Sequence, residues 1–185
     1  HSVLHPHIED MPHHWKKMRV EEAIFASEMP FTILQPAAYM QNILTESTRI
    51  YEKQSIHVPY STDSKSSPVD IEDVADAASL VLNERGHLGA IYELCGPEIL
   101  TPQDQAKVLS DYIGFEVCVQ QISLDEWKSE AKNMNLGDYA LQSLVDMFVY
   151  YDSNGFWGNS YVLESLLKRS LNTFRQFVKS NFKLI

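Results

Sequence analysis

The chain has 185 residues, which is long enough for one ordinary domain with a sizeable core. Its 25 acidic residues exceed its 15 basic residues, and the formal net charge of −10 argues against a nucleic-acid partner, since phosphate binding needs a basic patch. No apolar run approaches the roughly 20 residues that cross a bilayer, so we expect no membrane span.

The first thirty residues predict the end of a strand, a loop and a helix. Residues 1–6 read like the last turn of a strand followed by a loop. Pro12 suits the first position of a helix, because its missing N–H would be unpaired there in any case. Apolar residues from Trp15 to Phe25 recur loosely at helical spacing. Pro30 ends the helix, because a proline disfavours helix at the residue before it.

Two short strands are expected in the next thirty residues. The apolar run Phe31–Leu34 is typical of a buried parallel strand, and Pro36 stops it. Residues Tyr39–Tyr51 can return to helix, and Ile56–Tyr60 is a second strand candidate.

The clearest helix start in the sequence is Asp70, whose carboxylate can cap the free N–H groups of the helix that follows. An apolar stripe continues this helix to Leu82, and Ala90–Cys95 then reads as a strand. We expect Phe31–Leu34 and Ala90–Cys95 to lie parallel in one sheet, with helix 70–82 packed on it. We also expect Phe31–Leu34 to lack a neighbour on one side, and self-association through that exposed edge would follow.

The remaining elements alternate in the same way. Thr101 as a cap followed by Pro102 begins a helix that ends near Gly114, and Phe115–Gln121 reads as a strand. From Leu136 onward the pattern is helical and aromatic. The alternation of strands and helices makes the fold class α/β.

Several segments in this order resemble one family. They are Val69–Ala75, Tyr92–Glu98, Gly155–Asn159 and the stretch Pro12–Asn42. Together they resemble the second half of an NmrA-like atypical short-chain dehydrogenase/reductase. The resemblance implies the C-terminal part of a Rossmann-like doubly wound parallel sheet with a small, mostly helical substrate lobe.

The resemblance also implies a division of the chain and a missing part. Residues 1–121 would be the remainder of an NAD(P)-binding domain with interleaved substrate-lobe segments, and residues 122–185 the mainly helical C-terminal substrate lobe. The family's glycine-rich phosphate loop lies in its first half and is not in this sequence. We therefore expect a fragment that binds NADP or NAD weakly or not at all by itself, whereas a full-length parent would bind it.

The resemblance gives Lys17, His13 and Ser2 candidate catalytic roles. In the broader superfamily a tyrosine acts as general acid, and a lysine four residues later binds the cofactor ribose. Here His13 takes the tyrosine position and Lys17 the lysine position, and residues four apart share one helix face. A histidine can also pass a proton. Ser2 falls where the superfamily often has a serine that hydrogen-bonds substrate. The alternative for Lys17 is an ordinary solvent-exposed lysine, and the alternative for Ser2 is a residue at an exposed chain end.

The loop after the first strand matches the family's nicotinamide loop. Pro36, Ala37, Tyr39 and Asn42 would lie beside the cofactor, and Gln35 replaces the family's usual arginine. For Tyr39 and Asn42, ordinary packing and helix capping are alternatives to cofactor contact of about equal weight.

The histidines and cysteines indicate no metal site. Five histidines crowd into the first fourteen residues, but no cysteine has ligand spacing beside them, so a chance cluster is favoured over a zinc site. Cys95 and Cys118 do not make a disulfide framework, which favours reduced thiols in the cytoplasm.

The sequence leaves three functions open. The first is an NAD(P)-dependent oxidoreductase that acts on an unknown small carbonyl or quinone. The second is a regulatory or interaction module that senses the dinucleotide without hydride transfer, which the loss of the tyrosine favours. The third is a fragment that does neither, because it lacks the phosphate loop.

Overall fold

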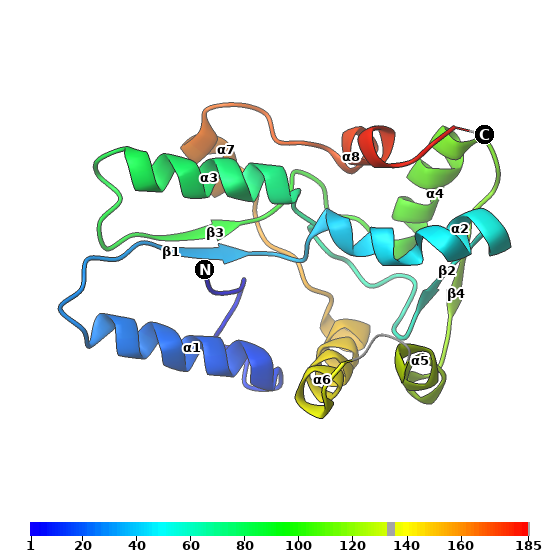
Figure 1. The fold of residues 1–185 in the computed structure, drawn as a ribbon, viewed down its shortest axis with the longest axis horizontal. Coiled ribbons are helices and arrows are strands. Elements are labelled where there is room, and N and C mark those ends of the chain that lie inside the picture. Colours follow the sequence, from blue (N-terminus) through cyan, green and yellow to red (C-terminus); the bar gives the residue numbers. More distant parts are fainter. Residues whose placement is uncertain (133–135, 185) are drawn as a thin grey trace.

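The computed structural model describes residues 1–132 and 136–184, and Figure 1 shows their arrangement. Helices and strands alternate along most of the chain, as the sequence predicts. In chain order the elements are α1 (Pro12–Phe25), β1 (Ile33–Pro36), the 3-10 helix η1 (Met40–Glu46), α2 (Ser47–Lys53), β2 (Ser55–Val58), α3 (Ile71–Asn83), β3 (Ile91–Leu94), α4 (Pro102–Ile113), β4 (Cys118–Gln121), α5 (Leu124–Ala131), α6 (Asp138–Asn154), α7 (Tyr161–Leu167) and α8 (Phe174–Asn181).

The predicted parallel pair of strands is confirmed. β1 and β3 run parallel, with Ile33 opposite Ile91 and Pro36 opposite Leu94. All four residues of β1 are buried, which explains why the strand is a continuous apolar run apart from Gln35. Figure 1 shows α3 on one face of this pair and α1 on the other, the layering of a doubly wound sheet.

The expectation that the first strand lacks a neighbour on one side is wrong. The Ser2 amide donates to the Leu34 carbonyl at 2.7 Å, and the Leu4 amide donates to the Pro36 carbonyl at 2.9 Å. The first residues of the chain therefore continue the sheet beside β1, on the edge away from β3. The physical reason is that an amide of a buried backbone needs a partner, and the carbonyls of β1 supply one.

A second parallel pair, β2 with β4, carries the other half of the core. Ser55 lies opposite Cys118 and Val58 opposite Gln121. α4 and α8 pack on each other and bury Leu109, Phe174 and Phe177 beside it. Both hydrophobic clusters of the described residues draw on the chain before and after residue 121, and the division at that residue stays a prediction.

Helix starts follow the capping signals of the sequence. The Asp70 carboxylate accepts from the Glu72 amide at the start of α3. Thr101 and Asp104 satisfy each other's backbone N–H groups in a capping box at the start of α4. Gly114 ends α4 with φ of 99°, the left-handed conformation in which glycine has no Cβ penalty.

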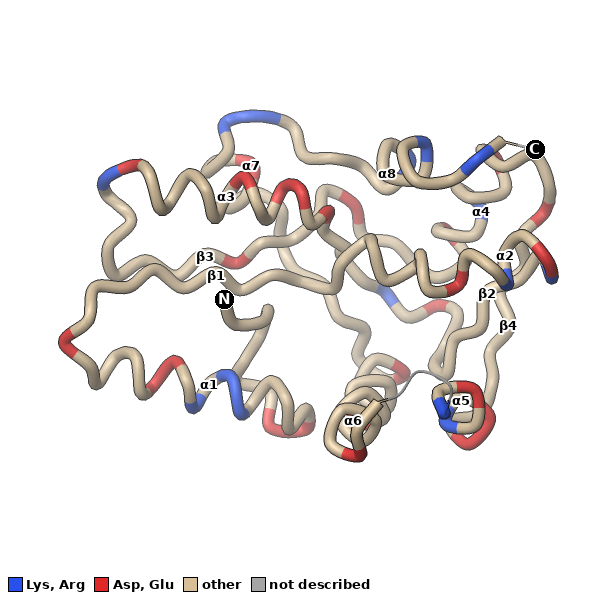
Figure 2. Tube along the Cα trace, viewed as in Figure 1, with Lys and Arg blue, Asp and Glu red and all other residues tan. Residues whose placement is uncertain are grey.

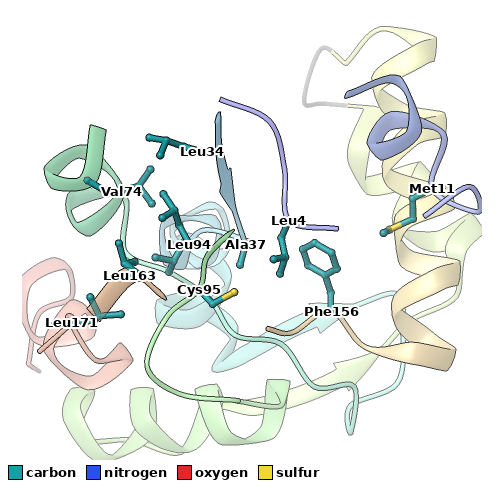
Figure 3. Close-up of a cluster of buried hydrophobic side chains, with 12 residues drawn as sticks. Leu4, Met11, Leu34, Ala37, Val74, Leu94, Cys95, Phe156, Leu163 and Leu171 are labelled. Atoms are coloured by element: carbon teal, nitrogen blue, oxygen red, sulfur yellow. The ribbon is translucent and has the colours of Figure 1, made fainter. Parts of the chain in front are cut away.

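In the core around β1 and β3, the first residues of the chain pack against the ends of both strands. Figure 3 shows Leu4, Ala37 and Cys95 close together, with the Phe156 ring beside Leu4. Leu94, on β3, points toward Leu163 and the C-terminal segments. This packing fixes the carboxyl end of β1, where the candidate site begins.

The surface carries its charge without one concentrated basic region. Figure 2 shows lysine and arginine positions spread over α1, α2, α8 and several loops. Among the described helices, none combines the length and apolar character that a membrane crossing needs.

Candidate functional site

A cavity of about 510 Å³ lies at the carboxyl end of β1. Pro36 is the last residue of that strand, and Ala37 and Tyr39 follow it directly in the cavity wall. In open α/β sheets, ligands bind in the crevice outside the carboxyl ends of the strands. The remaining walls come from Val3, from η1, β2, α4, α5 and α6, from His14 on α1, and from the segment that contains Phe156.

All four residues of the predicted nicotinamide loop line this cavity: Pro36, Ala37, Tyr39 and Asn42. Backbone pairing fixes their position, because Val69 donates to the Ala38 carbonyl and Met40 donates to the Val69 carbonyl, each at 2.9 Å. The loop is thus tied to the chain segment that leads into α3. Sequence reasoning found these residues through the resemblance, and the structure brings them together.

Six aromatic rings form a continuous wall along the cavity, which we call the aromatic wall. Each ring contacts the next, with centroids 4.8 to 6.0 Å apart, in edge-to-face or stacked geometry. In order the rings belong to Trp127, Phe148, Tyr60, Tyr151, Phe156 and His14. Burial raises the pKa of Tyr60 to about 12 and also raises the pKa of Tyr151, so both phenols stay neutral and can donate hydrogen bonds. The wall suits a flat, conjugated ligand.

His14 ends the aromatic wall as a neutral imidazole. Its side chain is buried, and Nδ1 lies 3.0 Å from the Leu4 carbonyl, which can only accept. Nδ1 therefore carries the proton, and Nε2 is the acceptor. Burial lowers the pKa of His14 to about 4, because the cation would lose its hydration.

The low pKa of His14 predicts a pH-dependent stability. Between about pH 4 and 6.5 the unfolded chain binds a proton at this residue and the folded chain does not, so the free energy of unfolding falls as the pH falls through this range. From pH 7 to pH 5 the loss is about 2 kcal/mol. Urea unfolding of the wild type and of His14→Gln at both pH values measures it. The exposed His7→Gln is the control; equal pH slopes in wild type and His14→Gln would contradict the assignment.

Ser2, His13 and Lys17 are not among the residues that line the cavity, although Val3 and His14, the chain neighbours of Ser2 and His13, are. His13 and Lys17 do face one side of α1, and burial, then Lys17 and Lys16, lower the pKa of His13. His13 Nδ1 lies 3.3 Å from the Tyr139 hydroxyl on α6. Ser2 is buried rather than an exposed end residue, and its hydroxyl has no hydrogen-bond partner among the described residues. The roles predicted for these three residues stay predictions.

Sequence reasoning missed two polar contacts between residues far apart in the sequence. Gln35 on β1 donates to the buried carboxylate of Glu21 on α1 at 2.8 Å, which ties the helix to the sheet. His57 Nδ1, on β2, donates to the carboxylate of Glu130, on α5, at 3.0 Å. The aromatic spacing within α6 was visible in the sequence, but no local signal links His57 to a carboxylate so far along the chain.

The sequence matches the NmrA-like family over residues 1–177. The chain belongs to the NmrA-like family. The match covers nearly the whole chain and confirms the family that the segments resemble.

Two curated relatives are similar over most of this chain. Quinone oxidoreductase 2 of Escherichia coli (strain K12) is 25% identical over 183 residues, which are 99% of this chain and 64% of the relative. NAD(P)H azoreductase of Xenophilus azovorans is 26% identical over 161 residues, 87% of this chain and 56% of the relative. This NmrA-like chain thus spans less than two thirds of the length of these relatives.

Solved structures agree on the fold. The NADPH complex of the E. coli quinone oxidoreductase superposes with a TM-score of 0.86 at 25% identity, over 98% of this chain and 64% of that one. The Citrobacter sp. triphenylmethane reductase complexed with NADP(H) gives a TM-score of 0.85 at 23% identity, over 98% and 63% of the two chains. The predicted Rossmann-like α/β class is confirmed by these neighbours.

Proposed function

We propose that this NmrA-like chain forms the acceptor pocket of an NAD(P)H-dependent reductase whose substrates are flat, conjugated molecules, quinones first among them. The aromatic wall beside the loop after β1 carries this proposal. A cavity of about 510 Å³ is of the size that small-molecule ligands occupy. The two relatives that reduce quinones and azo compounds by name support the same class of acceptor.

The residues of the chain fit one end of a dinucleotide. Pro36, Ala37 and Tyr39 would lie beside the nicotinamide, and Lys17 would hold the ribose. The buried Ser2 hydroxyl lacks a partner among the described residues, as expected for a group that meets a ligand. When bound, the reduced cofactor supplies the hydride. Its diphosphate needs a turn of backbone N–H groups at a helix start, which the 185-residue sequence does not offer as a glycine-rich loop.

A second function is cofactor sensing without catalysis. It is favoured because His13 replaces the tyrosine that acts as general acid in the superfamily. In that case the protein binds the dinucleotide as a sensor and catalyses no hydride transfer. We place either activity in the cytoplasm, because Cys95 and Cys118 are unpaired thiols. Self-association stays a prediction, now assigned to the outer edges of β3 and residues 2–4, and light scattering across protein concentration tests it.

Loss of one ring should weaken acceptor binding. Phe148→Ala removes the ring between Trp127 and Tyr60, and quinone affinity should fall about 3- to 10-fold, since an aromatic pair contributes about 0.5–1.5 kcal/mol. Quenching of Trp127 fluorescence by a benzoquinone or naphthoquinone reports the binding. Val149→Ala on the exposed face of α6 is the matched control.

The two functions separate in one assay of the full-length protein. NADPH oxidation that depends on added quinone supports the reductase. Dinucleotide binding by calorimetry without such oxidation supports the sensor. Unchanged quinone affinity in Phe148→Ala would show that the aromatic wall does not contribute to quinone binding.

A further inference from the structure

Four polar side chains from η1, α2, β2 and α5 contact one another, and we call them the His57 cluster. Arg49 Nε lies 3.0 Å from Glu46 Oε2, and Arg49 Nη2 lies 2.8 Å from Glu130 Oε2. The other oxygen of the same Glu130 carboxylate lies 3.0 Å from His57 Nδ1. His57 and Glu46 both line the cavity.

The contacts orient the His57 ring. A carboxylate only accepts, so the Nδ1 proton of His57 points to Glu130 and Nε2 is the ring nitrogen left for a ligand. Arg49 in turn holds Glu130 in place through its second oxygen. The His57 side chain is only 12% exposed, so a ligand in the cavity meets an imidazole whose position is already fixed.

The charges of the cluster balance when His57 is protonated. Glu46 and Glu130 carry two negative charges and Arg49 carries one positive charge. An imidazolium at His57 therefore brings the sum to zero, and transfer of its proton to a ligand returns the cluster to a net charge of −1. Gln120, opposite His57 on β4, is uncharged and does not alter this count.

The position of the cluster complements the nicotinamide loop. Pro36 ends β1, and Ala37 and Tyr39 follow it. His57 lies on β2, and Pro59 and Tyr60, which also line the cavity, come after that strand. Figure 1 shows β2 well separated from β1 along the molecule. If a flat acceptor lay against the aromatic wall, the nicotinamide loop and His57 would contact different edges of the molecule.

We propose that His57 is the catalytic residue that protonates a carbonyl oxygen of the acceptor, with Glu130 and Arg49 as positioning residues. The inference rests on the proposed reductase function. When bound, the reduced nicotinamide would supply a hydride, which is two electrons and one hydrogen, and would be oxidised; the quinone would become a hydroquinone anion that needs one proton. The second quinone oxygen takes the proton from His57 Nε2, so that an O–H bond forms and an N–H bond breaks. His57 keeps its Nδ1 proton, which stays hydrogen-bonded to Glu130, and Nε2 regains a proton from water.

The test compares two acceptors that differ in their need for a proton. A quinone needs hydride and proton, whereas a cationic triphenylmethane dye needs only hydride, because its cation becomes neutral on accepting it. In the full-length protein, His57→Gln should lower NADPH-dependent quinone turnover about 100- to 1,000-fold and leave dye turnover within about threefold. Glu130→Gln should show the same selectivity with a smaller loss on quinone. His87→Gln, a histidine bonded to Tyr92 away from this cavity, is the control.

Binding provides a readout that is independent of turnover. Quinone affinity measured by Trp127 quenching should stay within about threefold in His57→Gln, which shows that the pocket is intact. Equal losses of turnover with quinone and with dye in His57→Gln would mean that His57 has only a structural role. Unchanged quinone turnover would mean that His57 takes no part in the reaction. Either result overturns the inference. A wild-type protein that reduces neither acceptor overturns the proposed function itself.

Discussion

Gly96→Ala should destabilise the protein by about 4 kcal/mol or more, because a methyl group at this position has no room. Its Cβ would lie 1.8 Å from the Pro68 carbonyl oxygen and 2.7 Å from the carbon that bears it. Both are backbone atoms, so no side chain can rotate away. The backbone itself must move, and urea unfolding followed by circular dichroism measures the cost.

The same substitution should disturb the candidate site. Gly96 donates to the Ser67 carbonyl at 3.3 Å, and Val69, two residues later, exchanges hydrogen bonds with Ala38 and Met40. Displacing Pro68 therefore pulls on the loop that carries the cavity wall, and quinone binding should weaken together with stability.

A glycine in open space provides the control. Gly137 precedes α6, and an added Cβ there meets no atom within 4 Å. Gly137→Ala should change the free energy of unfolding by no more than about 1 kcal/mol. Similar stability of the Gly96 and Gly137 variants would contradict the close approach of the two segments.

Arg169→Ala should destabilise the protein by about 3 kcal/mol. Arg169 Nη1 lies 2.7 Å from Asp73 Oδ1, and the Asp73 side chain is fully buried, whereas the guanidinium is 38% exposed. Removing the arginine leaves a buried carboxylate with the Asn172 amide, at 2.9 Å, as its remaining donor. A lost partner of a buried ion pair costs about 3–5 kcal/mol, and the partial exposure of Arg169 places the effect at the low end.

Two further variants separate charge from packing. Asp73→Asn in the Arg169→Ala background removes the unpaired charge and should recover part of the lost stability. Arg175→Ala breaks the exposed pair with Asp111, whose side chains are 58% and 43% exposed, and should cost less than about 1 kcal/mol. If Arg175→Ala and Arg169→Ala destabilise equally, the burial of Asp73 has no energetic consequence.

The Asp70–Asp73 segment caps a helix and also holds other parts of the chain in place. Its sequence predicts helix capping, and Asp70 does cap α3. The structure adds that Asp70 also accepts from Gln41 and Asn172, and that Asp73 holds Arg169. This segment thus joins α3 to η1, through Gln41, and to the segment that contains Arg169 and Asn172.

The sequence by itself determined the local features of this protein. Capping at Asp70 and Thr101, the left-handed turn at Gly114 and the apolar run of β1 each follow from residues within one helical turn or one strand, so short-range chemistry was enough to predict them. The resemblance of ordered segments added the family and the loop after β1.

Only the tertiary structure decided what the cavity can do. His57 meets Glu130 across 73 positions of sequence, and His14, on α1, meets Phe156, which follows α6. It also placed residues 2–4 beside β1, where backbone amides find their carbonyl partners. Such contacts depend on how separate elements pack, which no local pattern encodes, whereas caps and turns depend on neighbours along the chain.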